Sequence, residues 1–170
     1  AADLTLRGFQ VRLFSRSEST TVRLGKLGEI ELIEGGVSKK AAPFFLSPHL
    51  PPVVQGVDLI VVTTPAVGHE YLAKGIANYL TDGQKILLNP GHTGGALHFA
   101  NLLRQAGCTA DVQLCETVTL TTFAACRSSA GWKFTGARLT CFVRRSQENT
   151  RLAWCEKCKM SFLMLFPPPT

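Results

Sequence analysis

The sequence of 170 residues contains no G-x-G triplet, so it carries no complete G-x-G-x-x-G dinucleotide fingerprint. It also lacks the Gly-Lys-Ser/Thr ending that a P-loop requires. No apolar run approaches the roughly 18 residues that a membrane-spanning helix needs, and the run from Met160 to Phe166 is far too short. The first residues show no basic-then-apolar signal pattern. These absences argue against a membrane protein and predict a cytoplasmic location.

Charged residues are few, at 18%, beside 45% hydrophobic residues, which is ordinary globular composition. Residues 1–126 carry ten basic and ten acidic side chains, whereas residues 127–170 carry eight basic and two acidic ones, so the net charge of +6 lies in the last quarter. A basic tail can bind nucleic acid. No nucleic-acid recognition motif accompanies it, so we interpret it as a solvated segment and expect no nucleic-acid partner.

The six cysteines include one C-x-x-C pair, Cys155 and Cys158. A structural zinc site needs about four ligands, usually from two such pairs. No second pair exists, and all four histidines lie far upstream. We therefore expect reduced thiols and no metal site.

Strand-like and helix-like apolar patterns alternate along the chain. The clearest is Asp58–Thr63, a nearly continuous β-branched run typical of a strand buried on both faces of a parallel sheet. A segment with four prolines, 41–52, is predicted to be a loop. Further strands are predicted at Phe9–Phe14, Glu29–Ile33, Lys85–Leu88, Asp111–Cys115, Leu120–Cys126 and Arg138–Val143. Helices are predicted at Ala1–Arg7, from Ser17 or Ser19 to Leu24, at Val67–Leu80 and at Ala96–Ala106.

This alternation predicts an α/β fold, a Rossmann-type doubly wound and mostly parallel sheet. The chain opens in a helix that feeds a strand, so we expect the sheet to lack its first strand and the glycine fingerprint that follows it. Residues 1–145 are predicted to form a partial NAD(P)-binding domain. Residues 146–170 are predicted to be a basic tail that starts the connection to a helical catalytic domain.

Ligands of such sheets bind beyond the carboxyl ends of the strands. After the second strand of a dinucleotide fold, a carboxylate accepts hydrogen bonds from the ribose of NAD, whereas an arginine pairs with the 2′-phosphate of NADP. Ser15 and Arg16 occupy this place, and no carboxylate occurs before Glu18. We predict NADP as the cofactor, with NAD as the alternative; Arg16 as an ordinary surface residue is the competing interpretation.

The glycine-rich segment Asn89–Gly95 follows another predicted strand. Its glycines could let backbone N–H groups approach a phosphate. Loop flexibility explains them equally well, so both interpretations stay open.

Residues 1–18, 58–99 and 115–128 together resemble the opine dehydrogenases, and the stretch NPGHTGGAL from Asn89 is the most specific part. The resemblance implies reductive condensation of an α-keto acid with an amino acid or amine by an NAD(P)-dependent enzyme, and it allows a homodimer of the full-length protein. The family's catalytic histidine and its carboxylate partner belong to a C-terminal helical domain that this chain lacks. The resemblance therefore places no catalytic residue in this chain, which we expect to be inactive alone.

The same resemblance implies roles for particular residues. The nicotinamide would be bordered by Thr63, Thr64, Pro65 and Ala66, and the cofactor would also lie near Asn89, Pro90 and Gly91. Glu116 and Thr117 would face the cleft between domains. His69 would touch cofactor or substrate, or would serve only a structural role. Ser15 and Arg16 complete the expected cofactor site.

Other functions are compatible with the predicted fold. A ketopantoate reductase or a glycerol-3-phosphate dehydrogenase has the same two-domain plan, although the NPGHTGG stretch argues against both. A non-catalytic nucleotide-binding module is the alternative from outside the enzymes.

Overall fold

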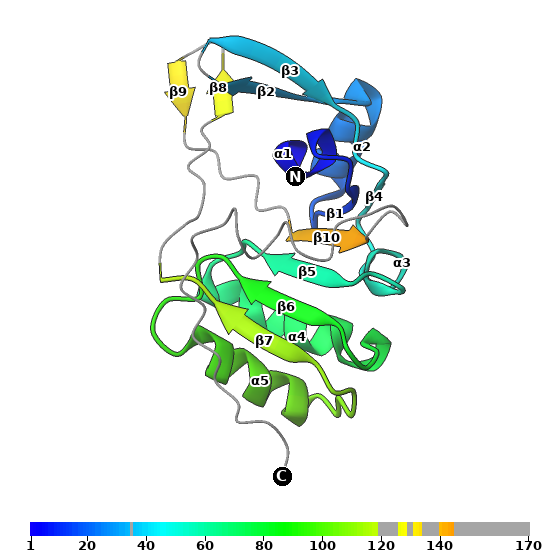
Figure 1. Cartoon of the computed structure of the whole chain (residues 1–170), viewed down its shortest axis with the longest axis vertical. Coiled ribbons are helices and arrows are strands. Elements are labelled where there is room, and N and C mark those ends of the chain that lie inside the picture. The colour runs from blue at the N-terminus through cyan, green and yellow to red at the C-terminus, as the bar shows by residue number, and fades with distance from the viewer. Residues whose placement is uncertain (35, 119–125, 129–130, 134–139, 145–170) are drawn as a thin grey trace.

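The computed structural model describes residues 1–34, 36–118, 126–128, 131–133 and 140–144. Six strands form one sheet in the order β4-β1-β10-β5-β6-β7 (Figure 1). β1 runs parallel to β4, and β5, β6 and β7 are parallel to one another. The predicted mostly parallel α/β sheet is therefore confirmed. The strands are β1 (Gln10–Phe14), β4 (Phe45–Ser47), β5 (Leu59–Val62), β6 (Lys85–Leu88), β7 (Gln113–Glu116) and β10 (Thr140–Arg144).

The strand predicted at Arg138–Val143 is present as β10, but its place and direction were not foreseen. It lies between β1 and β5 and is antiparallel to both, with Thr140 opposite Phe14 and Cys141 opposite Val61. In a doubly wound sheet this central position belongs to the first strand, whose absence was predicted. β10 supplies hydrogen-bond partners to two strand edges that would otherwise expose unpaired backbone groups.

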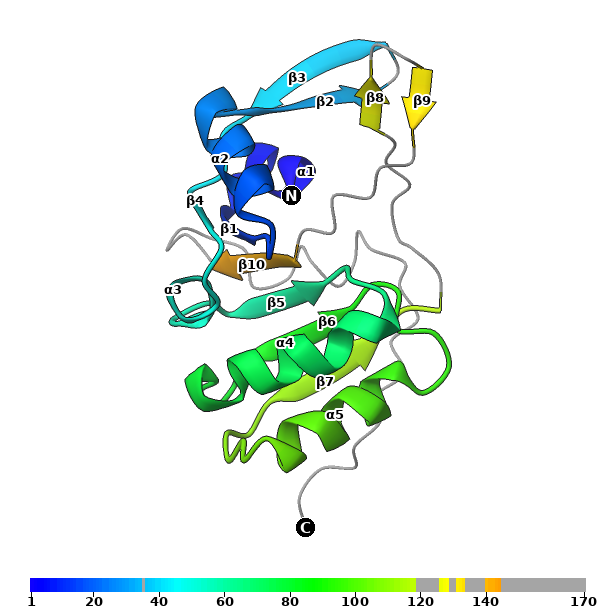
Figure 2. The ribbon, with the colours of Figure 1, turned by 180° about the vertical axis from the view of Figure 1, so that it is seen from behind.

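Helices cover both faces of the sheet. α4 (His69–Ile76) and α5 (Gly95–Gln105) pack side by side on one face of β5, β6 and β7 (Figure 2). α1 (Ala2–Leu6) packs on the opposite face. The remaining helical segments are α2 (Glu18–Leu27), α3 (Pro51–Val54) and the 3-10 turns η1 (Ala66–Gly68) and η2 (Ala77–Tyr79).

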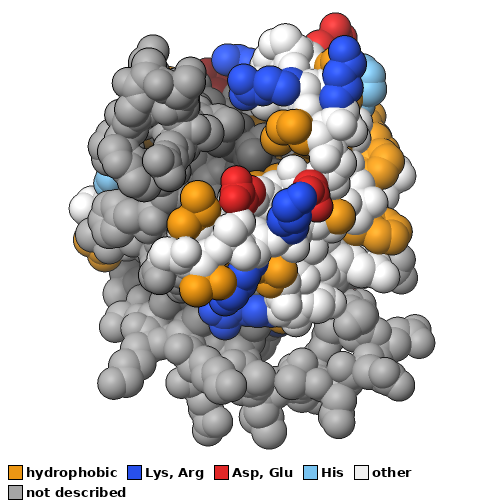
Figure 3. All heavy atoms as spheres, turned by 90° about the horizontal axis from the view of Figure 1, so that it is seen from above, with side chains coloured by type: hydrophobic (Ala, Val, Ile, Leu, Met, Phe, Trp, Pro, Cys, Tyr) orange, Lys and Arg blue, Asp and Glu red, His pale blue; other side chains and the backbone are white. Residues whose placement is uncertain are grey.

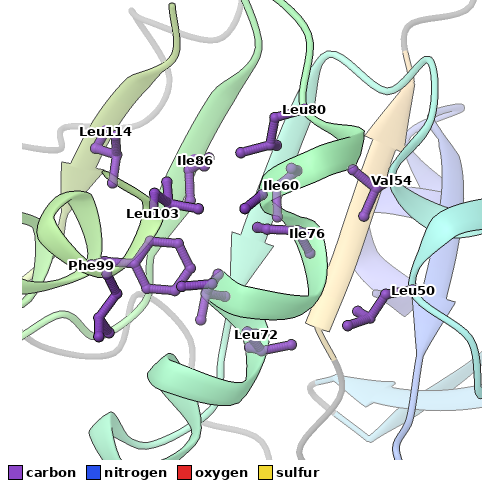
Figure 4. Close-up of a cluster of buried hydrophobic side chains, with 14 of the residues drawn as sticks. Leu50, Val54, Ile60, Leu72, Ile76, Leu80, Ile86, Phe99, Leu103 and Leu114 are labelled. Atoms are coloured by element: carbon purple, nitrogen blue, oxygen red, sulfur yellow. The ribbon is translucent and has the colours of Figure 1, made fainter. Parts of the chain in front are cut away.

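The strands bury alternate residues on opposite faces, as the two-residue repeat of a β-strand requires. Ile60 and Val62 point into the cluster beneath α4 and α5, whereas Val61 joins the cluster on the α1 side. Phe99 of α5 lies fully buried in the larger cluster (Figure 4). This two-sided burial explains why β5 and β6 read as continuous apolar runs.

The loop or irregular connector predicted at 41–52 is present only in part. β4 pairs with β1 there, and α3 follows it. Pro43 and Pro48 flank the three residues of β4 and do not interrupt it, and β4 is an edge strand, where proline is tolerated.

The strand predicted at Glu29–Ile33 is present as β2 (Ile30–Glu34), and it pairs with an unforeseen β3 (Val37–Ala41). β8 (Cys126–Ser128) pairs antiparallel with β9 (Gly131–Lys133). The strand predicted at Leu120–Cys126 lies almost wholly outside the described residues.

Basic and acidic side chains lie next to one another on the described part of the face shown in Figure 3. Lys40 of β3, for example, forms an ion pair with Glu29. None of the helices in the described segments has the length and apolarity that a membrane span requires. The basic tail, 146–170, lies outside the described residues.

Candidate functional site

The carboxyl ends of β5, β6 and β7 are tied together at one edge of the sheet. The backbone N–H of Asn89, after β6, donates to the Val62 carbonyl at the end of β5 (2.8 Å). The N–H of Thr117, after β7, donates to the Leu88 carbonyl at the end of β6 (3.0 Å). The loops after β5 and β6, which are both predicted to bind the cofactor, therefore start side by side.

The segment after β1 places Arg16 at the surface of this edge. Ser15 is buried, and its N–H donates to the Ser47 carbonyl of β4 (3.3 Å). Ser17 caps α2 by accepting a hydrogen bond from the Thr20 N–H (3.3 Å), as predicted, and its Oγ lies 2.8 Å from that of Ser19. Hydrogen bonds thus hold both neighbours of the exposed Arg16: Ser15 through its backbone N–H and Ser17 through its side chain.

The segment after β5, Thr63–Ala66, leads into η1 and α4. The turn is closed by the Gly68 N–H, which donates to the Pro65 carbonyl (2.8 Å). Thr64 Oγ1 is buried and has no hydrogen-bond partner in the described chain. A methyl group on Gly68 would lie 3.3 Å from Thr64, so this turn leaves little space beside the threonine.

Asn89 is buried at the start of the next loop and accepts a hydrogen bond at Oδ1 from the Thr117 hydroxyl (3.1 Å). The bond between Asn89 and Pro90 is cis. The Gly91 N–H donates to the Thr117 carbonyl (3.0 Å). Thr117 thus holds the loop after β6 through both its side chain and its backbone.

Glu116 places a carboxylate inside the glycine-rich loop. Its Oε2 accepts from the Ala96 N–H (2.6 Å) and its Oε1 from the Gly94 N–H (3.1 Å), at the start of α5. A Cβ on Gly91 would lie 2.4 Å from the Glu116 Cβ, closer than real Cβ atoms approach. The start of a helix favours an anion, and here the protein provides its own. Of the two interpretations of these glycines, the geometry favours neither a phosphate cradle nor flexibility: Gly91 leaves room for Glu116.

His69 is the first residue of α4 and is only 1% exposed. Its ring packs edge-on against Phe99 (centroids 5.6 Å apart, 79°). Neither ring nitrogen has a hydrogen-bond partner within the described chain. Burial lowers the pKa of His69, the Thr64 backbone opposes this shift, and His98 and His92 add to it. His69 is thus a buried, packed histidine in this structure, and both of its expected roles, contact with cofactor or substrate and a structural role, stay predictions.

No group of three or more potential metal ligands occurs among the residues that the structure describes; Cys155 and Cys158 are outside them. A cavity of about 270 Å³ lies away from the loops after β5 and β6, beside β1, α2 and β4. It is lined mainly by apolar residues, among them Leu13, Leu24, Ile30, Phe44, Phe45 and Leu46.

No family model matches the sequence. An opine dehydrogenase of Arthrobacter sp. strain 1C is 36% identical over 107 residues, which cover 63% of this chain and 30% of that protein. The chain is therefore similar in sequence to an opine dehydrogenase. It spans less than a third of the length of that curated relative.

Solved structures of octopine dehydrogenase share the fold. One, in complex with NADH and agmatine, superposes with a TM-score of 0.54 at 23% identity, covering 64% of this chain and 28% of that one. Another, in complex with NADH and L-arginine, gives 0.52 at 25% identity, covering 62% and 27%. The expected Rossmann-type fold is thereby confirmed.

The structure brings most of the expected site residues to one edge of the sheet. The loops containing Thr63–Ala66 and Asn89–Gly91 meet there, and Glu116 and Thr117 lie beneath the second loop. Tyr71 of α4 was not predicted from the sequence, and its ring lies under the Arg16 guanidinium (5.6 Å from Cζ to the ring centroid). Helical spacing alone does not mark an exposed tyrosine as a partner for a distant arginine.

Proposed function

We propose that this chain is the nicotinamide-dinucleotide-binding part of an opine dehydrogenase-like enzyme that condenses an α-keto acid with an amino acid or amine. Two observations support this proposal. The loops after β1, β5 and β6 end at one edge of a mostly parallel sheet, where dinucleotide folds bind their cofactor. The similarity to an opine dehydrogenase extends over 63% of the chain.

The residues at the end of β1 fit the adenosine end of NADP. Arg16 is exposed, and among the described residues no carboxylate forms an ion pair with it. A guanidinium in this place would pair with the 2′-phosphate, and the hydroxyls of Ser17 and Ser19 lie beside it in the sequence. We therefore assign NADP in preference to NAD.

The loops after β5 and β6 would hold the nicotinamide end. Thr63, Thr64, Pro65 and Ala66 would border the ring, and Asn89, Pro90 and Gly91 would line the adjoining wall. When bound, the reduced cofactor supplies the hydride that converts an imine of the keto acid and amine into a secondary amine. This chain binds and orients the cofactor, and the groups that transfer protons belong to the rest of the enzyme.

Octopine dehydrogenase structures hold agmatine, L-arginine or pyruvate beside NADH. By analogy we propose a keto acid such as pyruvate and an amino acid or amine as substrates. A cytoplasmic location accords with the free thiols of Cys108 and Cys115.

The test is oxidation of NADPH and NADH by the full-length enzyme that contains this chain, with pyruvate and with or without a panel of amino acids. We expect oxidation that requires both substrates and is faster with NADPH. Oxidation with the keto acid alone would identify a simple keto-acid reductase. Binding of the nucleotide without oxidation under any condition would identify a non-catalytic nucleotide-binding module.

A further inference from the structure

Tyr71 links α4 to the end of β1. Its ring stacks on Phe14, the last residue of β1 (centroids 6.5 Å apart, 22° between planes). The Arg16 guanidinium carbon lies 5.6 Å from the centroid of the same ring, within cation–π range. Phe14 is buried and Tyr71 is 46% exposed, so the tyrosine is anchored in the core and presents its ring at the surface.

This contact decides where the charge of Arg16 resides. A free arginine side chain has many rotamers, and holding one of them costs conformational entropy when a ligand binds. A guanidinium already stacked on an aromatic ring has lost part of that freedom beforehand, and its N–H groups stay free to form a fork with a phosphate. The ring therefore organises Arg16 in advance without consuming its hydrogen-bond donors.

The surrounding charges leave this guanidinium available. Glu70, next to Tyr71, is paired with Lys74 (2.7 Å). Glu18, in the first turn of α2, is exposed to solvent, where its charge is screened. Ser17 and Ser19 add two hydroxyls at the start of the same ten-residue helix, which favours an anion at this end.

We propose that Tyr71 is a positioning residue that sets the preference for NADP over NAD, by holding Arg16 where the adenosine 2′-phosphate binds. This inference rests on the proposed function, and in particular on the assignment of Arg16 to the adenosine end of the cofactor. Tyr71 does not itself contact the phosphate in this proposal. It acts through Arg16.

The test measures binding of two probes that lack nicotinamide, 2′,5′-ADP and 5′-AMP, by calorimetry on the chain. The unmodified chain should bind 2′,5′-ADP more tightly. Tyr71→Leu should lower the ratio of the two affinities about two- to fivefold, the range of an exposed cation–π contact. Tyr71→Phe, which keeps the ring, should leave the ratio unchanged.

Thermal unfolding and a double substitution with Arg16 separate the positioning role of Tyr71 from a general contribution to the stability of the fold. Tyr71→Leu also removes packing against Phe14, so its thermal unfolding is measured as well. A looser fold would weaken both probes together, whereas loss of positioning lowers only the affinity for 2′,5′-ADP. In an Arg16→Leu background, Tyr71→Leu should have no further effect on the ratio.

Two results would overturn the inference: an unchanged ratio in Tyr71→Leu, whether both affinities stay the same or fall equally, or a further fall in the ratio in the Arg16→Leu background. An equal fall with unchanged thermal unfolding would place the stacked pair against the adenine instead of the phosphate, whereas an equal fall with a lower unfolding temperature would indicate a looser fold. Failure of the unmodified chain to bind either probe would instead contradict the proposed function, so the two failures are distinguishable.

Discussion

Replacing Glu116 by alanine should destabilise the chain, because this carboxylate satisfies two backbone donors at the start of α5. Hydrogen bonds to a charged acceptor contribute roughly 1.5–3 kcal/mol each, and a helix cap contributes about 1 kcal/mol. The Ala96 bond is short and partly buried, whereas the Gly94 bond is exposed and water can replace it. We therefore expect a loss of roughly 2–3 kcal/mol in the free energy of unfolding.

Urea unfolding followed by circular dichroism measures this loss. With a slope of roughly 2 kcal/mol per molar urea, the midpoint should fall by about 1 M. Glu116→Gln should lose less, because its amide keeps one acceptor oxygen. Glu70→Ala is the matched control: it removes a surface carboxylate that pairs only with Lys74 across one helical turn, and such pairs contribute little.

A second measurement tests whether the start of α5 can bind an anion. Without Glu116, the N–H groups of Gly94 and Ala96 lose their partner at a helix start that favours an anion. Added phosphate should therefore stabilise Glu116→Ala more than the unmodified chain. If the midpoint of Glu116→Ala equals that of Glu70→Ala and phosphate affects both alike, the carboxylate does not hold this loop and the reasoning fails.

Four further substitutions probe the same region. Gly91→Ala should cost roughly 1–3 kcal/mol, because its methyl group would meet the Glu116 Cβ at 2.4 Å; Gly95→Ala, at 3.2 Å from Oε2, should cost less in the same urea assay. Phe99→Ala should cost roughly 3–5 kcal/mol, and a loss below about 1 kcal/mol would contradict its place in the core. Because burial lowers the pKa of His69 below 6.5, the native state should lose stability as the pH falls from 6.5 towards that lower pKa. His69→Gln should reduce this pH dependence, and an unchanged dependence would mean that His69 is not the group responsible.

Much of the fold could be predicted because burial leaves a local pattern. β5 and β6 are buried on both faces, so each appears as a continuous apolar run. β3 could not be found this way, because it buries only Ala41 and carries two lysines. The direction of β10 was equally inaccessible, since an alternating pattern shows that a strand is half-buried but not which way it runs.

Some features of the candidate site could likewise be predicted from the sequence, whereas others could not. The position of Arg16 was predictable because it closely follows a strand, which the sequence shows, whereas its role stays a proposal. Glu116 was placed near the cleft, but its bonds to Gly94 and Ala96 connect the end of β7 with the start of α5, and no spacing rule links those positions. The sequence shows the glycines, but it does not show that the Glu116 side chain lies against Gly91 and leaves no room for a side chain there.

The two proposed ends of the cofactor site share one principle of construction. At the adenosine end, Arg16 belongs to the turn after β1, but Tyr71 of α4 holds it. At the nicotinamide end, Asn89 and Gly91 belong to the loop after β6, but Thr117, which follows β7, holds both, while Glu116 fixes the start of α5. In each case an element distant in the sequence supplies the support. Substitutions at Tyr71, Glu116 and Thr117 should therefore alter cofactor binding even though none of the three needs to touch the cofactor.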